Sequence, residues 1–175
     1  MAQGDGVNVF ETSRQLGRIP VVGLRGVVAL ERTAWLKQLL RHPLMQGTVV
    51  LTSEVDRAAE LDYARVQYYE PAKATTAEGC LCCGMNRGLG DALRALFLRV
   101  LSKRARPIDR VLIDATVLEP EQLAFTFKHA PFLGQRYCYQ MTLTVVGANA
   151  FMGDASEPEP SQTLVFDENT ILRTN

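Results

Sequence analysis

The sequence predicts an α/β fold, a mostly parallel sheet with helices on both faces. Short apolar runs alternate along the chain with amphipathic segments, which is typical of βαβ units. The runs have the length of buried strands, and several are bounded by glycine or proline. The chain has 175 residues, of which 47% are hydrophobic and 22% charged, so we expect one globular domain.

The first half of the chain contains three expected strands and one helix. The first strand covers residues 18–25, and a loop is expected over 26–32. Thr33 then precedes apolar residues at helical spacing, and Pro43 ends that helix. The further elements expected here are a strand over 47–52, a loop or short helix over 53–64, and a strand over 65–70.

The second half begins with a glycine-rich stretch, 71–90, which predicts a loop. A helix is expected from Asp91, because apolar residues then recur on one face and Pro107 follows its basic end. The next expected elements are a strand over 109–116, a helix over 119–129 and a strand over 137–147. We expect the central neighbours of the sheet to be the strands 18–25, 47–52, 109–116 and 137–147.

The two ends of the chain differ from this pattern. Residues 1–17 are polar and lack periodicity, so we expect a mobile arm there and the domain over 18–175. Residues 154–161 form an acidic, proline-containing linker. A last strand or hairpin is expected over 163–166 and 170–172.

The charge and hydropathy exclude several classes of partner. Nineteen Lys and Arg balance nineteen Asp and Glu, which gives no electrostatic case for nucleic acid or an anionic membrane. No apolar run approaches the roughly 20 residues that a spanning helix needs. The first residues lack the pattern of a signal peptide, so we expect a cytoplasmic protein with reduced thiols.

Three of the four cysteines lie together in the sequence GCLCCG, at Cys80, Cys82 and Cys83. Thiolates are soft ligands, and three of them with one open position suit tetrahedral zinc that is handed on, or a similar divalent or Cu(I) ion. The flanking Gly79 and Gly84 would allow the backbone kink that adjacent ligands need. Two alternatives stay open, small buried side chains and a redox pair at CxxC spacing.

Other candidate ligands are isolated in the sequence. Cys138 lies at the start of an expected strand, where a core position is the favoured interpretation. His42 and His129 lie at helix ends, where capping or interaction with the helix dipole is expected. Glu54 follows the second strand and is interpreted as a solvated loop charge, with metal ligation as the alternative.

Three stretches resemble the CobW-like metallochaperone GTPases, a branch of the P-loop GTPases. These are IPVVGLRGVVALERTAWLKQLLRHP, EGCLCCGMNRGLGDALRAL and DRVLIDATVLEP, which resemble the family's phosphate loop, its GCxCC metal motif and its second-switch strand. With the order of strands, the resemblance covers Ile19 to the C-terminus and implies a P-loop NTPase-like fold. The resemblance leads us to expect a single degenerate domain without the family's C-terminal domain.

The phosphate loop departs from the motif G-x-x-x-x-G-K-[ST]. Here it is GVVALERT, in which Gly26 and Thr33 match. Glu31 replaces the second glycine and adds bulk and negative charge near a polyanion. Arg32 replaces the lysine, and its planar guanidinium differs in shape from an ammonium.

The other nucleotide motifs are also altered. Asp114 stands where the family has glutamate, and Val117 where it has the glycine that meets the γ-phosphate. A buried carboxylate without a nucleotide role is the alternative interpretation of Asp114. The base-recognition motif Asn-Lys-x-Asp is missing, although the final LRTN could be its remnant.

These observations predict a zinc-binding, CobW-like protein that has lost GTP hydrolysis and acts in metal delivery, buffering or regulation. Its partners would be the metal ion and a client metalloprotein. Gly26, Arg32, Thr33 and Asp114 mark the former nucleotide site, where we expect no GTP or magnesium. The alternatives are an active GTPase with an unusual phosphate loop and a pseudo-GTPase that serves as an interaction module.

Overall fold

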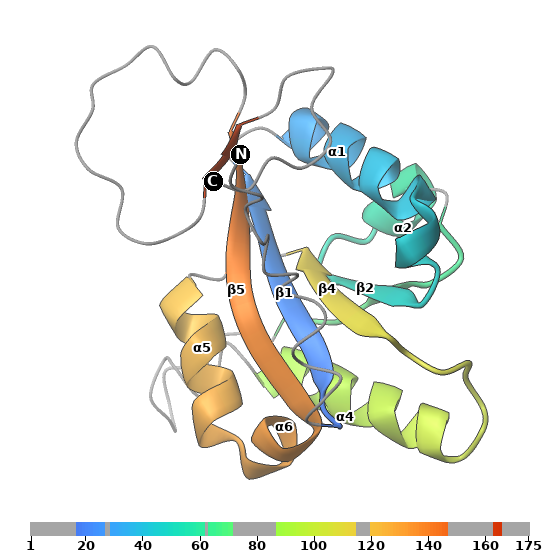
Figure 1. Cartoon of the computed structure of the whole chain (residues 1–175), viewed down its shortest axis with the longest axis vertical. Helices are drawn as coiled ribbons and strands as arrows, with labels where there is room; N and C mark the ends of the chain where they lie inside the picture. The colour runs from blue at the N-terminus through green and yellow to red at the C-terminus, as the bar shows by residue number, and fades with distance from the viewer. Residues whose placement is uncertain are drawn as a thin grey trace, which may run out of the picture.

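A computed structural model describes residues 17–26, 29–61, 63–71, 87–114, 120–146 and 163–165. They form a six-stranded sheet in the order β3-β2-β4-β1-β5-β6, in which each neighbouring pair is parallel (Figure 1). The strands are β1 (Ile19–Gly26), β2 (Thr48–Thr52), β3 (Val66–Tyr68), β4 (Arg110–Asp114), β5 (Tyr137–Val146) and β6 (Thr163–Val165). The parallel sheet and the adjacency of its four predicted central strands are confirmed.

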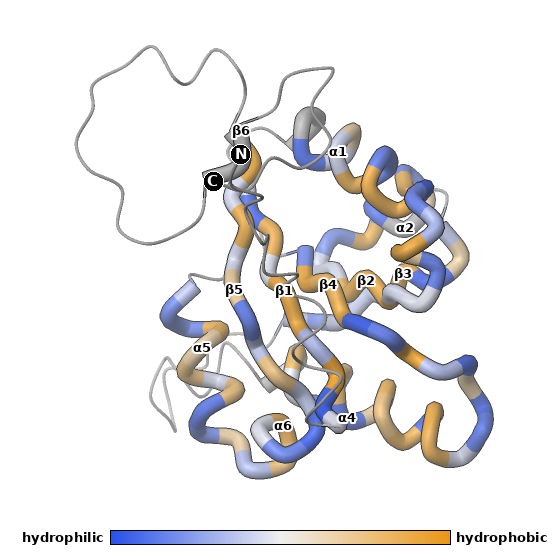
Figure 2. The backbone as a smooth tube through the Cα atoms, in the orientation of Figure 1, coloured by the Kyte–Doolittle hydropathy of each residue, from blue (hydrophilic) through white to orange (hydrophobic). Residues whose placement is uncertain are grey.

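Helices cover both faces of this sheet, as predicted. One face carries α1 (Ala29–Arg41), the short η2 (Pro43–Met45) and α2 (Arg57–Leu61). The other carries α4 (Arg87–Leu101), α5 (Pro120–His129) and α6 (Pro131–Arg136). Figure 2 shows apolar residues along much of β1, β4 and β2, which are the strands enclosed between these layers.

The strand residues divide between the two cores by alternation. Val21, Val111 and Ile113 pack against α4, α5 and α6 on one face. Leu24 and Leu112 pack against α1 and α2 on the other. Successive side chains of a strand point to opposite faces, which explains why β1, β2 and β4 each contribute to both cores.

Two helices begin earlier than the sequence analysis predicts. α1 begins at Ala29, inside the expected loop 26–32, because Ala, Leu, Glu and Arg favour a helix and no glycine interrupts them. α4 begins at Arg87 rather than Asp91, although glycines lie at 88 and 90. Its Leu89 is fully buried in the core, so tertiary packing outweighs the low helix propensity of glycine.

Two short helices concern segments that the sequence left open or did not predict as helical. The stretch 53–64 contains a short helix, α2, after a turn. α6 was not predicted, because six residues with an internal glycine carry too little periodicity, although Pro131 suits the first turn of a helix. β6 pairs with β5 in parallel, and residues 1–16, 154–161 and 170–172 lie outside the described residues.

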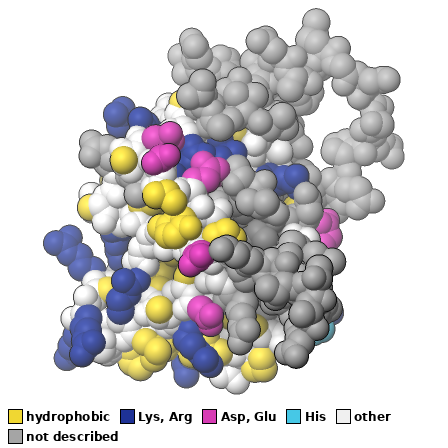
Figure 3. Space-filling model, turned by 180° about the vertical axis from the view of Figure 1, so that it is seen from behind, with side chains coloured by type: hydrophobic (Ala, Val, Ile, Leu, Met, Phe, Trp, Pro, Cys, Tyr) yellow, Lys and Arg dark blue, Asp and Glu magenta, His cyan; other side chains and the backbone are white. Residues whose placement is uncertain are grey.

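The surface mixes charged and apolar side chains. On the face drawn in Figure 3, hydrophobic side chains gather in small patches between Lys, Arg, Asp and Glu. Among the described residues, the large exposed apolar side chains are those of Leu44, Val55, Tyr68, Leu98, Leu101 and Phe125. Within the part of the chain that the structure describes, none of the helices has the length and apolar character needed to cross a membrane.

Candidate functional site

The carboxyl ends of β1, β2 and β4 meet at one edge of the sheet. Asp114, the last residue of β4, stands in register with Leu24 of β1 and Thr52 of β2. Ligands of parallel α/β sheets bind at this edge, next to the helices that follow the strands. The predicted site residues Gly26, Arg32, Thr33 and Asp114 therefore share one region.

Four charged side chains at this edge form a closed ring, which we call the ion cluster: Arg32, Glu54, Arg57 and Asp114. Nε of Arg32 lies 2.8 Å from Oδ1 of Asp114, and Nε of Arg57 lies 2.9 Å from Oδ2 of the same carboxylate. Glu54 joins the other ends, with Oε1 at 2.9 Å from Nη2 of Arg32 and Oε2 in contact with Nη2 of Arg57. Each carboxylate thus pairs with both arginines, and the ring carries no net charge.

The ion cluster is almost entirely removed from water. The exposed fractions are 1% for Arg32, 2% for Arg57 and 0% for Asp114, while the Glu54 side chain is 36% exposed. Buried ions cost several kcal/mol each unless opposite charges and hydrogen bonds compensate. Asp114 has both guanidinium groups beside it, at 2.8 and 2.9 Å, so opposite charge compensates the burial of this carboxylate.

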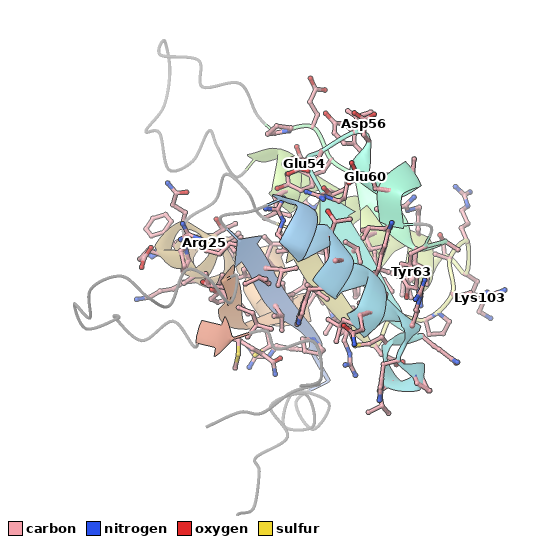
Figure 4. All side chains as sticks on the ribbon, turned by 90° about the horizontal axis from the view of Figure 1, so that it is seen from above. Arg25, Glu54, Asp56, Glu60, Tyr63 and Lys103 are labelled. Atoms are coloured by element: carbon pink, nitrogen blue, oxygen red, sulfur yellow. The ribbon has the colours of Figure 1, made fainter. Side chains whose placement is uncertain are left out.

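Two further contacts extend the ion cluster around Arg57. Its Nη1 donates a hydrogen bond to Oγ1 of Thr33 in α1 and lies 3.2 Å from Oε2 of Glu60 in α2. The N–H of Glu54 donates to Oγ1 of Thr52 at 3.1 Å, which fixes the turn after β2. Figure 4 shows Glu54 and Glu60 close together beside the start of α1, whereas Asp56 lies farther out.

Burial is the largest influence on the pKa of Asp114. Removal from water raises the pKa of this carboxyl above its usual value, and the guanidinium groups of Arg32 and Arg57 act in the opposite direction. Glu54 raises the pKa further through charge repulsion. The two arginines therefore favour the ionised form of Asp114, and burial opposes it.

Gly26 contributes through its backbone. Its carbonyl oxygen accepts a hydrogen bond from Nη1 of Arg32 at 3.1 Å. A Cβ at this position would lie 3.1 Å from the carbonyl oxygen of Val145 and 3.4 Å from Cβ of Arg32. Glycine therefore lets β1 turn into α1 in close contact with β5.

Two side chains of the loop motif contact other protein groups in this arrangement. In a phosphate loop the basic side chain reaches the phosphates and the Ser or Thr hydroxyl binds magnesium. Here all three guanidinium nitrogens of Arg32 contact protein oxygens, at 2.8, 2.9 and 3.1 Å. The Thr33 hydroxyl accepts a hydrogen bond from Arg57. The Arg32 and Thr33 side chains are thus engaged by the protein itself.

The structure corrects the interpretation of Glu54 and adds Arg57. Glu54 is not a solvated loop charge, because it pairs with two buried arginines. Arg57 was missed by the sequence analysis, although it is the one basic residue in the acidic stretch 53–64 and has Glu54 and Glu60 three residues away on either side. That i, i+3 spacing was a usable signal for ion pairing.

The remaining candidates are scattered. Nδ1 of His42 accepts a hydrogen bond from the N–H of Leu44 at 3.3 Å, so this histidine caps η2. His129 stacks on Phe125 with ring centroids 4.1 Å apart. Cys138 is a half-buried free thiol of β5.

The proposed metal ligands Cys80, Cys82 and Cys83 lie outside the described residues, as does Val117. The side chain of Glu31 is also outside them. Among the described residues no group of three or more His, Cys, Asp and Glu side chains could hold a metal ion.

Comparison with known proteins places this chain in a family. No curated protein matches it significantly. The structure resembles that of the Zn(II)-bound YjiA GTPase from E. coli, with a TM-score of 0.50 and 22% sequence identity over 75% of this chain. The match spans 41% of the YjiA chain, so the present chain corresponds to less than half of it. The family model of the CobW/HypB/UreG nucleotide-binding domain matches residues 20–170. The chain therefore belongs to the CobW/HypB/UreG family of nucleotide-binding domains.

Proposed function

We propose that this protein is a CobW-like metal-binding domain that has lost GTP hydrolysis. The ion cluster is the observation that carries the first half of this proposal. Arg32 pairs with Asp114 and Glu54 and binds the Gly26 carbonyl, so it has no guanidinium nitrogen left uncommitted for a phosphate. A triphosphate would have to displace these contacts and approach two carboxylates of its own sign.

Charge and solvation both oppose such a displacement. Like charges about 4 Å apart repel by about 4 kcal/mol at an effective dielectric of about 20. Asp114 is fully buried, and Arg32 and Arg57 lower its pKa against the opposite effect of burial. Transfer of Arg32 to a phosphate would leave that buried carboxylate with Arg57 as its one remaining partner in the ion cluster.

We expect GTP to bind no more tightly than about 1 mM, which corresponds to about −4 kcal/mol. The measurement is calorimetric titration of the reduced protein with GTP and magnesium. The double substitution Glu31→Gly with Arg32→Lys restores the loop motif, and it should regain some phosphate affinity without guanine selectivity. A micromolar affinity of the wild-type protein for GTP would instead support an active GTPase.

The second half of the proposal assigns a metal ion to Cys80, Cys82 and Cys83. Support comes from the GCLCCG sequence and from membership of the CobW/HypB/UreG family. Zinc, or a similar soft ion, is the proposed ligand, and the resemblance to YjiA, which was solved as a Zn(II)-bound GTPase, agrees with this choice. The role would be metal delivery, buffering or regulation through a client protein.

We expect Cys82→Ser to reduce zinc affinity at least about tenfold, because thiolates rather than hydroxyls are the ligands that zinc prefers. The circular dichroism should stay almost unchanged, since the residues of both apolar cores come from outside the GCLCCG sequence. Ligand thiols must lose protons to bind, so mild acid should release the ion. Zinc competition titrations of the reduced protein measure each effect.

Cys138→Ser is the matched control, because Cys138 belongs to β5 and is expected to be no ligand. Equal loss of zinc binding in both variants would contradict the three-cysteine site.

The ion cluster also suits a second function, a pseudo-GTPase that serves only as an interaction module. Absence of zinc, Cu(I) and cobalt uptake by the reduced wild-type protein would favour that module.

A further inference from the structure

Arg57 occupies the centre of a set of oxygen atoms from four separate segments. Its guanidinium contacts carboxylates of Glu54, Glu60 and Asp114 and the hydroxyl of Thr33. These atoms come from the turn after β2, from α2, from the end of β4 and from α1. Carboxylates and hydroxyls are the ligands that hard divalent cations such as Mg²⁺ prefer.

Two of these oxygens come from positions that hold Mg²⁺ in phosphate-loop proteins. In phosphate-loop proteins the hydroxyl of the loop Ser or Thr and an aspartate at the end of a neighbouring strand hold Mg²⁺. Thr33 occupies the hydroxyl position of the motif, and Asp114 ends β4 beside it. Both groups contact Arg57.

We propose that the Arg57 guanidinium takes the place of the magnesium ion in this domain. This inference rests on the proposed loss of GTP hydrolysis. It also gives a reason for that loss, because a side chain of the protein takes the place of the cation that accompanies the nucleotide. The buried guanidinium, 2% exposed, balances and orders the same oxygens that would otherwise ligate a metal.

The proposal predicts how the local charge changes when Arg57 is removed. With Arg57 present, two arginines face Glu54, Asp114 and the half-exposed Glu60. Without it, Arg32 alone would face three carboxylates, a local charge of −2 that a divalent cation neutralises. Truncation of Arg57 should therefore convert the site from one that excludes metal ions into one that binds them.

The experiment compares Mn²⁺ binding by the wild-type protein and Arg57→Ala, with free Mn²⁺ measured by electron paramagnetic resonance. Arg57→Ala should bind one Mn²⁺ per chain at the cluster, at least about tenfold more tightly than any wild-type binding. It should melt at a lower temperature than the wild-type protein, and saturating Mn²⁺ should raise that temperature by roughly 5 °C.

Two control variants separate this effect from a general loss of an arginine. Arg65→Ala removes a side chain that binds the backbone carbonyls of Gln46, Arg106 and Pro107, so no site for Mn²⁺ should appear. Arg57→Lys keeps a cation among the carboxylates and should also take up no Mn²⁺.

Arg57→Ala that folds but binds Mn²⁺ no better than the wild-type protein would overturn the proposal. If Arg57→Ala does not fold, Arg57→Gln is measured in the same way. Failure of both to fold in Mn²⁺ counts equally against it, because the ion should replace the missing cation. GTP binding by the wild-type protein would refute the proposed function instead, so the two failures are distinguishable.

Discussion

Asp114→Ala should lower the free energy of unfolding by about 3–5 kcal/mol, the range measured when one partner of a buried ion pair is removed. Asp114 is fully buried and pairs with Arg32 at 2.8 Å and with Arg57 at 2.9 Å. Its removal leaves two buried guanidinium groups with only Glu54 and the half-exposed Glu60 to balance them. Urea unfolding monitored by circular dichroism measures the loss.

Two variants control this prediction. Asp114→Asn keeps the shape of the side chain and should lose less, because its carbonyl oxygen can still accept a hydrogen bond from one guanidinium. Asp91→Ala removes an exposed carboxylate from α4 and should change the free energy of unfolding by less than about 0.5 kcal/mol. A loss below about 1 kcal/mol for Asp114→Ala would contradict the arrangement of the ion cluster.

Gly23→Ala should destabilise the fold by about 3 kcal/mol, at the upper end of the range for overpacking. Gly23 lies in β1, between β4 and β5. A Cβ there would approach Oγ1 of Thr142 to 2.4 Å and Cδ1 of Leu123 to 2.9 Å. Both neighbours are buried, at 4% and 0% exposed, so neither can turn away without a shift of β5 or α5.

Gly90→Ala is the matched control and should have the opposite sign. Gly90 lies within α4, and the nearest atom to an added Cβ is Cδ1 of Leu133 at 3.9 Å, an ordinary contact. Alanine in a helix is favoured over glycine by about 0.5–1 kcal/mol. Thermal unfolding of the two variants should therefore move the melting temperature in opposite directions. A similar loss of stability in both variants would show that the close contacts of an added Cβ at Gly23 do not cause the destabilisation.

Much of the sheet could be predicted because its strands are apolar on both faces. The runs that became β1, β2, β4 and β5 are bounded by polar or glycine-containing segments, so their existence and order were visible in the sequence. The start of α4 was not visible, because local propensity at Gly88 and Gly90 argues against a helix. Only the burial of Leu89 against distant side chains favours it.

The candidate site was predictable in position and not in chemistry. The motif at Gly26 to Thr33 and the strand that ends at Asp114 indicated the edge of the sheet at which the ion cluster lies. The partners of Arg32 depend on Glu54 and Arg57, which come from an irregular segment that no periodicity describes. Long-range pairing of buried charges is set by the tertiary fold, and the sequence alone contains no direct measure of it.

The central position of β1 has a consequence during synthesis. This strand leaves the ribosome before the other described strands, and its residue Val21 pairs with Val111 of β4, 90 positions later in the chain. At a translation rate of about 5–20 residues per second, the apolar β1 waits roughly 5–18 s for that neighbour. Unpaired apolar strands are prone to aggregation in this interval. The nascent chain is therefore a natural client for chaperones that bind extended hydrophobic segments.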